Sequence, residues 1–311
     1  MKNVLSYKRV LAVLSKLLVA WLSCVCGMAM AASPPSIGKI RVHEAAYEDT
    51  LVDMARAENL GYVEMRAANP DADPWLPGAG TKLVLPQEHL LPDGAREGIL
   101  INLPDMRLYY FPEKDGIPVS WPIGIGADGL LTPIGSTTVV RKMAGPSWRP
   151  TAEKRARDPS VPDVVGPGPD NPLGAYALYL GWPTYLIHGT NKPLGVGRRV
   201  SSGCIRMYPE AIEALFAKVA PGTKVMVVNQ PVKMAFKGGE LFMEAHPSLI
   251  QADAVEAQGR FIPEVPEGFM KRVISMAGDA APRLDWPLVR QVIRERRGYP
   301  VKITQSASIG P

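Results

Sequence analysis

Two residues that together can perform nucleophilic catalysis, His188 and Cys204, stand sixteen positions apart. A thiol with an ordinary pKa of about 8.5 is only a few per cent thiolate at neutral pH, so it needs a base or a positive environment before it attacks a carbonyl. An imidazole can supply both. The glycines between the two residues allow the chain to turn sharply. We therefore expect the two side chains to meet in space.

The residues around Cys204 fit the same chemistry. The oxygen of a tetrahedral intermediate must be held by backbone amides that approach it closely, and the amides of Ser202, Gly203 and Cys204 are the natural donors. Arg206 follows two positions later and either favours the thiolate or braces the loop. We expect bracing.

The N-terminal segment is typical of a secretory signal peptide. Basic residues among the first nine precede an apolar run over residues 10–28, and small residues follow as far as Ala31. We expect cleavage near Ala31 and a periplasmic location. The uncharged run over residues 17–36 leaves an uncleaved membrane anchor as an alternative, and Cys24 leaves a lipoprotein.

Cleavage changes both the charge and the cysteine count. The removed segment holds four of the 35 basic residues and no acidic one, so 31 basic residues face 30 acidic ones and no nucleic-acid partner is indicated. Cys24 and Cys26 leave with it, and Cys204 remains as a single thiol. In an oxidising compartment such a thiol points to catalysis, with a buried structural cysteine as the alternative. The other histidines are scattered and predict no metal site: His43, His89 and His246.

A small module is expected over residues 39–86, after a short linker, Ser33-Pro34-Pro35-Ser36. One helix should begin after Asp49-Thr50, a second should end at Asn69-Pro70, and a strand should cover residues 82–85. This order of strand, helix, helix and strand resembles a LysM glycan-binding module. Glu48 stands where that module usually has a glycine, so a spacer without glycan affinity is the alternative. Leu76-Pro77-Gly78 also matches the turn residues that are usual in a LysM module.

Residues 96–230 are expected to form a mainly β catalytic domain with a β-sandwich fold, because short strands dominate them. One amphipathic helix should start at Pro209. The segment 144–172, rich in Pro, Gly and Arg, is predicted to be a lid over the active site. Residues 231–311 are an accessory segment without assigned chemistry, with a hairpin at Gly238-Gly239 and a helix over residues 288–296. The expected strands of the catalytic domain cover residues 99–103, 106–111, 119–125, 136–141, 175–180, 185–188 and 224–229.

The motif around the two reactive residues resembles that of a known enzyme family. His188-Gly189-Thr190 followed by Ser201-Ser202-Gly203-Cys204-Ile205-Arg206-Met207 is similar to the signature of the YkuD-type L,D-transpeptidases, the ErfK/YbiS class in particular. Thr132-Pro133-Ile134-Gly135 and the Gly168 to Gly174 stretch also match, and with the LysM-like module the resemblance covers residues 39–230.

The resemblance implies a role for each matched residue. Cys204 would be the nucleophile that forms an acyl-enzyme, and His188 the general base and later acid. The backbone carbonyl of Gly189 would be the third member. Many relatives have His where this chain has Ser202, so the acid-base work falls on His188 alone. The expected catalytic set also includes Gly203, and the expected substrate-binding residues are Ser201, Arg206, Tyr185, Thr190 and Asn191.

The implied reaction cuts a peptidoglycan stem tetrapeptide at the L,D bond after diaminopimelate and releases D-alanine. An amine then attacks the thioester, either from a second stem peptide or from the C-terminal lysine of an outer-membrane lipoprotein. The reaction needs no cofactor and no metal, and carbapenems are expected to acylate Cys204. Because stem peptides are acidic, we also expect Lys142, Arg149 or Arg155 to contact substrate carboxylates.

Other enzyme classes fit the sequence less well. Papain-like peptidases place the cysteine before the histidine, which is the reverse of the order here. Sortases share the order but need a longer gap and a later catalytic arginine. A hydrolase of the same fold and a wall-binding protein with little activity remain as alternatives, and the first depends on how well the lid excludes water.

Overall fold

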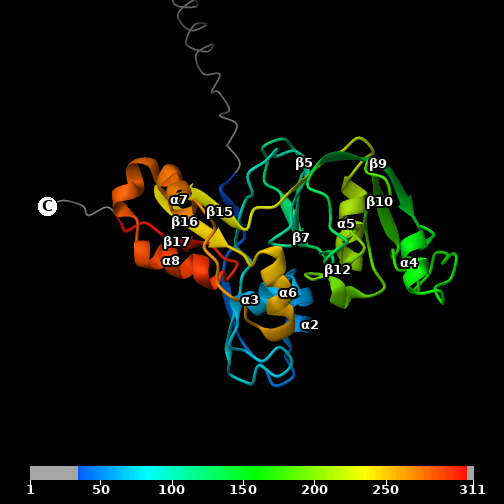
Figure 1. The fold of residues 1–311 in the computed structure, drawn as a ribbon, viewed down its shortest axis with the longest axis horizontal. Coiled ribbons are helices and arrows are strands. Elements are labelled where there is room, and N and C mark those ends of the chain that lie inside the picture. The colour runs from blue at the N-terminus through cyan, green and yellow to red at the C-terminus, as the bar shows by residue number, and fades with distance from the viewer. Residues whose placement is uncertain (1–33, 307–311) are drawn as a thin grey trace, which may run out of the picture. The chain divides into compact units, whose positions relative to one another are not determined.

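The computed structural model describes residues 34–306 (Figure 1). The predicted signal peptide, residues 1–31, lies outside this part of the chain. Residues 34–306 lie within one compact unit. Every helix in that range is too short or too polar to cross a membrane.

The first part of the unit has the predicted order of strand, helix, helix and strand. Strand β2 (Arg41–Glu44) pairs antiparallel with β3 (Lys82–Leu85), and helices α2 (Leu51–Ala57) and α3 (Tyr62–Ala68) lie between them in the chain. Thr50 caps α2, since its side-chain oxygen accepts from the Asp53 amide at 3.0 Å. Helix α3 ends at Ala68 with Asn69 as its C-cap, which agrees with the end predicted at Asn69-Pro70. The two helices and β3 share a small core of their own: Leu51, Met54, Leu60, Met65, Leu83 and Leu85.

The predicted linker is wrong at its last residue. Ser36 begins strand β1 (Ser36–Ile37), which pairs antiparallel with β4 (His89–Leu90). The Leu91 amide also donates to the Pro35 carbonyl at 3.0 Å. The chain therefore enters the unit already hydrogen-bonded to the segment that follows the small module.

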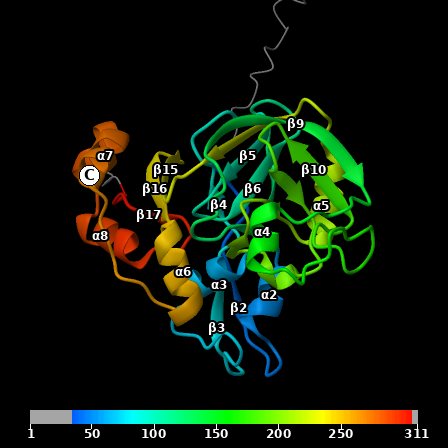
Figure 2. The ribbon, with the colours of Figure 1, turned by 45° about the vertical axis from the view of Figure 1, so that its right-hand side comes forward.

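The strands of the expected sandwich form one curled eight-stranded sheet and a separate two-stranded sheet. The order in the large sheet is β13-β11-β10-β9-β14-β5-β6-β7. Helix α5 (Pro209–Lys218) starts with Pro209 in the first turn, as predicted, and lies against β10 (Figure 2). The strands are β5 (Gly98–Asn102), β6 (Arg107–Phe111), β7 (Val119–Pro122), β9 (Gly135–Ala144), β10 (Tyr176–Leu180), β11 (Leu186–His188), β13 (Ile205–Arg206) and β14 (Lys224–Val228) in the large sheet, with β8 (Ile125–Gly126) and β12 (Arg199–Ser201) in the small one.

The predicted hairpin of β5 and β6 is confirmed by their antiparallel register, in which Leu100 faces Tyr109. The predicted strand over residues 119–125 is interrupted, because Gly124 leaves β7 and forms a bridge with Arg206. A side chain at Gly124 would place its Cβ 2.4 Å from the Gly195 carbonyl oxygen. This close backbone contact ends β7 and sets the start of β8.

The C-terminal segment has its own core. Strands β15 (Val232–Lys237), β16 (Glu240–Ala245) and β17 (Val301–Lys302) form a three-stranded sheet that helices α7 (Phe269–Ala277) and α8 (Trp286–Glu295) flank (Figure 1). The predicted turn at Gly238-Gly239 joins β15 to β16, and both glycines have positive φ, 56° and 79°. Helix α6 (Leu249–Gln258) lies against α3 of the small module. Helix α8 covers most of the range predicted for it, and its buried face is formed by Val289, Val292 and Ile293.

A cluster of buried charges joins these parts of the unit. The Lys233 ammonium lies 2.8 Å from an Asp105 carboxylate oxygen and 2.7 Å from one of Glu244. Arg107 contacts Glu64 of α3 at 2.9 Å. The metal-ligand atoms of Asp105, Glu244 and His246 lie within 4.8 Å of one another, a spacing that suits a metal ion. The Lys233 ammonium contacts both carboxylates of that group, so a lysine supplies the positive charge there.

Candidate active site

Cys204 and His188 line the same cavity, which has a volume of about 530 Å³. His188 is the last residue of β11, and Cys204 is in the loop between β12 and β13. Strands β11 and β13 are parallel neighbours, with His188 opposite Arg206. In this register Cys204, the residue just before β13, lies level with Leu186, two residues before His188 on β11.

The environment of His188 keeps the imidazole neutral. Its Nδ1 lies 2.5 Å from the Gly189 carbonyl oxygen, which can only accept, so Nδ1 carries the proton and Nε2 keeps its lone pair. The ring is 4% exposed. Burial, together with the positive charge of Arg206, lowers the pKa of His188 from 6.5 to about 4. At neutral pH the imidazole is therefore uncharged, and its Nε2 can accept a proton.

Cys204 rests as a thiol. Burial raises the pKa of its Sγ–H group, although a backbone hydrogen bond from Leu186 and the charge of Arg206 oppose this shift. The Sγ–H group donates to the Thr184 carbonyl oxygen at 3.4 Å. The thiol must leave this carbonyl before it can give its proton to His188. The two groups thus start as a neutral pair.

The loop that carries Cys204 is fixed by two hydroxyl groups. Ser201 Oγ donates to the Cys204 carbonyl at 2.5 Å and accepts from the Gly203 amide at 3.1 Å. Thr132 Oγ1 donates to the Gly203 carbonyl at 2.9 Å. The Gly203 amide is therefore already engaged, which removes it from the predicted set of oxyanion donors. The amides of Ser202 and Cys204 have no hydrogen-bond acceptor within residues 34–306 and remain candidates.

Gly203 itself has a steric role. Its φ is 96°, and a Cβ there would lie 2.8 Å from Cε1 of Tyr185. The Tyr185 ring packs against this backbone and makes an edge contact with Trp182, at a centroid distance of 6.3 Å. Tyr185 is accordingly absent from the cavity lining, unlike the other predicted substrate-binding residues, Ser201, Arg206, Thr190 and Asn191.

The segment predicted to be a lid contributes one wall of the cavity. Strand β9 runs into it, Trp148 pairs with Val165, and helix α4 (Ala152–Arg157) follows. Asn171 is fully buried at its base, where its amide donates to the carbonyls of Pro146 at 2.6 Å and Gly166 at 2.9 Å. The lid residues that line the cavity are Ser147, Trp148, Arg149, Thr151, Lys154 and Pro172.

The cavity is electropositive. Four cationic residues line it, Arg149, Lys154, Lys192 and Arg206, and none of its lining residues is Asp or Glu. Such a wall favours an anionic ligand. Arg206 also braces the site through its backbone, which exchanges hydrogen bonds of 2.8 and 2.9 Å with Gly124.

Two of the three cations predicted to face the substrate are elsewhere. The Lys142 ammonium donates to the carbonyls of Phe216 at 2.5 Å and Val219 at 2.9 Å, since it caps the end of α5. Arg155 forms an ion pair with Asp163 on the outside of the lid. Only Arg149 of the predicted three lines the cavity.

Comparison with known proteins places this site in a family. Residues 96–227 match the YkuD family, described as the L,D-transpeptidase catalytic domain. The chain is 44% identical over 250 residues to "Probable L,D-transpeptidase YbiS" of Escherichia coli (strain K12), which covers 78% of this chain and 80% of the relative. The chain belongs to the L,D-transpeptidase family. The predicted resemblance to the YkuD-type L,D-transpeptidases is confirmed, and the protein is an enzyme.

A second relative and a solved structure extend the comparison. The enzyme is 40% identical over 263 residues to "Probable L,D-transpeptidase YcfS" of E. coli (strain K12), covering 82% of this chain and 80% of the relative. It is also similar to the NMR structure of the catalytic domain from the E. faecium L,D-transpeptidase, at 25% identity and a TM-score of 0.35, over 44% of this chain and 100% of that chain.

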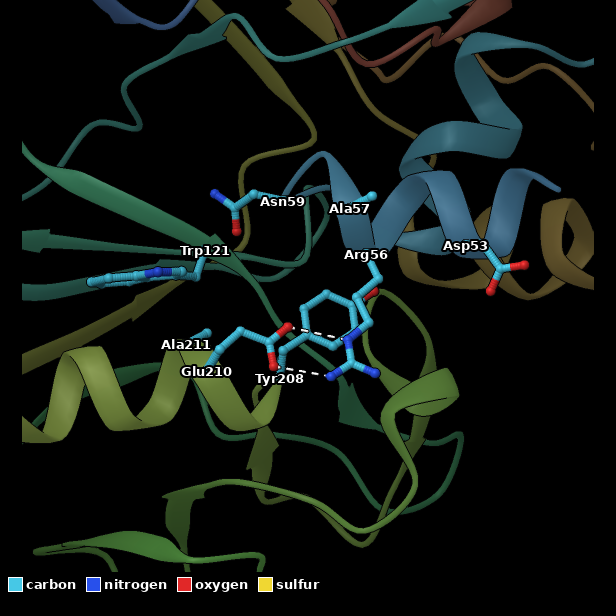
Figure 3. A pocket seen from close by; sticks show the side chains of 8 residues that line it. All are labelled: Asp53, Arg56, Ala57, Asn59, Trp121, Tyr208, Glu210 and Ala211. Atoms are coloured by element: carbon cyan, nitrogen blue, oxygen red, sulfur yellow. Dashed lines mark hydrogen bonds and ion pairs between the residues drawn. The ribbon is translucent and has the colours of Figure 1, made fainter. Parts of the chain in front are cut away.

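Another cavity of this L,D-transpeptidase, of about 540 Å³, lies between α2 of the small module and α5. Arg56 reaches across it to Glu210, with two hydrogen bonds of 3.1 Å, and lies over the Tyr208 ring (Figure 3). Neither a thiol nor an imidazole lines it. Its side chains join the module to the catalytic sheet, and we assign no reaction to it.

The sequence interpretation missed several residues of the site. Thr132 and Asn171 lie within motifs that the family resemblance used, yet their bracing roles follow only from contacts across the fold. Lys154 and Lys192 line the cavity. Lys192 directly follows Asn191, a predicted substrate-binding residue, and this position could have identified it. The sequence offered no signal for Thr184 apart from the proline before it.

Proposed function

We propose that Cys204 and His188 carry out the L,D-transpeptidase reaction on a stem tetrapeptide. Nε2 of His188 takes the thiol proton as Sγ bonds to the carbonyl carbon of the L,D bond after diaminopimelate. The carbonyl oxygen becomes an oxyanion, which the amides of Ser202 and Cys204 would hold. The C–N bond then breaks, the proton on His188 passes to the departing amine, and D-alanine leaves a thioester on Cys204.

The second half of the reaction resolves the thioester. The acceptor amine attacks the carbonyl carbon, and its proton passes to His188. The thiolate leaves and recovers that proton as a thiol. Acceptors that fit this chemistry are the amine of a second stem peptide and the C-terminal lysine of an outer-membrane lipoprotein. A carbapenem presents a strained amide to the same sulfur, so we also propose that it acylates Cys204.

The observation that carries this proposal is the shared cavity of Cys204 and His188, with an imidazole that burial keeps neutral and that the Gly189 carbonyl orients. The cationic walls support an acidic peptide as the substrate, because four positive side chains face a cavity that no carboxylate lines. The lid covers one side of this cavity and favours transfer to an amine over hydrolysis, since it limits the access of water.

The location and the role of the small module belong to the same proposal. We propose that residues 1–31 are a signal peptide cleaved near Ala31 and that the mature enzyme works in the periplasm. The β2-α2-α3-β3 order supports a LysM-like module over residues 39–86. In this proposal the module contacts the glycan strands, residues 96–230 are the catalytic domain, and residues 231–311 are an accessory segment.

Mass spectrometry of muropeptides tests the reaction. Purified enzyme incubated with tetrapeptide muropeptides should yield new dimers and free D-alanine, and Cys204→Ala should yield neither. Tripeptides without dimers would mean hydrolysis in place of transfer. Full activity of Cys204→Ala would refute the proposed nucleophile.

A charge-reversal pair tests the anionic substrate. Lys154→Glu places a negative charge in the cavity wall and should raise KM several-fold. Arg155→Glu is the matched control, because Arg155 lies on the same helix but pairs with Asp163 outside the cavity. Equal KM values for the two variants would contradict the proposed role of the cationic wall.

A further inference from the structure

The turn between β10 and β11 contains a strained residue. The Tyr185 amide donates to the Trp182 carbonyl at 3.3 Å, so Pro183 and Thr184 are the two central residues of a β-turn. Thr184 has a φ of 70°. Because the ring of Pro183 excludes a positive φ at its own position, the turn is of type II, with the positive φ at the third residue.

That third position is normally taken by glycine or asparagine. A positive φ is sterically costly for a β-branched side chain such as that of Thr184. Glycine would adopt the same backbone without strain. The Cys204 thiol donates its hydrogen bond to the backbone carbonyl of Thr184, and any residue at this position would offer that carbonyl. Local backbone structure therefore gives no reason for a threonine here.

The side chain makes no contribution to the fold that would offset the strain. Thr184 is exposed, and within residues 34–306 its hydroxyl has no hydrogen-bond partner. The residue lines the reaction cavity together with Cys204 and His188, and its own carbonyl lies 3.4 Å from Sγ. The residue with the strained backbone is thus a direct neighbour of the Cys204 sulfur in the lining of the cavity.

We propose that Thr184 is a substrate-binding residue whose hydroxyl bonds to the peptide backbone of the donor beside the bond that Cys204 attacks. A hydroxyl both donates and accepts, and a peptide backbone offers carbonyl and amide partners for it. The turn holds the hydroxyl in place because its strained φ is fixed by Pro183 and by the pairing of the flanking strands. This inference rests on the proposed role of Cys204 as the nucleophile.

Substitutions at this position separate stability from binding. Thr184→Gly relieves the strain and should raise Tm by about 2–4 °C. It also removes the hydroxyl, so KM for the donor tetrapeptide should rise about three- to ten-fold while kcat changes less. Thr184→Val keeps the branched shape and the strain, and it should raise KM equally with no gain in Tm. Thr184→Ser restores the hydroxyl and should recover most of the lost affinity.

Two results would overturn the inference. One is a glycine or valine variant with kcat/KM within two-fold of the parent enzyme, and the other is a glycine variant with a lower Tm. Calorimetric binding of the tetrapeptide to the Cys204→Ala protein, with and without Thr184→Val, measures the contact without turnover. If Cys204→Ala stays active, the proposed nucleophile fails; if it is inactive but binds equally well with either residue at 184, only the role of Thr184 fails.

Discussion

The protonation of His188 gives the sharpest test of the site, and the perturbation is pH. Burial and the charge of Arg206 lower the pKa of His188 from 6.5 to about 4. The imidazole should therefore stay neutral from pH 8 down to about pH 5. We expect kcat/KM to fall on the acid side with an apparent pKa near 4, well below that of a free imidazole.

The same shift makes the free energy of unfolding depend on pH, by an amount that can be worked out. The pKa falls from 6.5 to about 4, and each pKa unit corresponds to about 1.4 kcal/mol, which gives about 3 kcal/mol in total. Because the folded pKa is the lower one, the unfolded chain binds more protons between these values. The stabilisation is complete above pH 6.5 and is lost as the pH falls through 4.

Urea unfolding at pH 7 and pH 4 measures this effect. Relative to His188→Gln, which cannot titrate, the parent enzyme should lose about 3 kcal/mol more between the two pH values. The variant also serves to assign the His188 resonances, so that the ring can be titrated directly by NMR. A midpoint near 6.5 or above, as in a thiolate–imidazolium pair, would refute the reasoning.

Three further predictions concern the surroundings of the site. Lys233→Met leaves two buried carboxylates without their ammonium partner and should cost about 3–5 kcal/mol in urea unfolding; an unchanged midpoint would contradict the role of the charge cluster. Asn171→Ala removes the hydrogen bonds at the base of the lid, so amide exchange there should accelerate and KM should rise, while unaltered exchange would count against a fixed lid. Gly197→Ala puts a Cβ 2.3 Å from Cα of Gly61 and should destabilise by about 1–3 kcal/mol more than Gly80→Ala, which has a similar positive φ and open space; equal losses would disprove the close contact.

Local signals in the sequence predicted the elements well. Pro209 set the start of α5, Gly238-Gly239 formed the predicted turn, and Thr50 capped α2. Each of these depends on the backbone preferences of one or two residues. The order of the strands in the large sheet depends on pairings between distant segments, such as β14 with β5, and no local pattern contains them.

The candidate site shows the same division. The types and spacing of His188 and Cys204 indicated the chemistry, but the neutral state of the imidazole follows from its burial, which only the fold determines. Lys142 was expected to face the substrate because of its charge and position in the chain. It caps α5 instead, since the end of that helix offers carbonyls that need a donor.

The position of Lys233 has a practical consequence for anyone who wishes to shorten this enzyme. The lysine follows Cys204 in the chain, yet its ammonium group pairs with Asp105 in the turn between β5 and β6, where the residue is only 3% exposed. A protein truncated after residue 230 would keep His188 and Cys204 and would leave Asp105 without its ammonium partner. The segment after residue 230 thus supplies the counterion of Asp105 through Lys233. Removing this segment should make the protein aggregate and should not yield a smaller active enzyme.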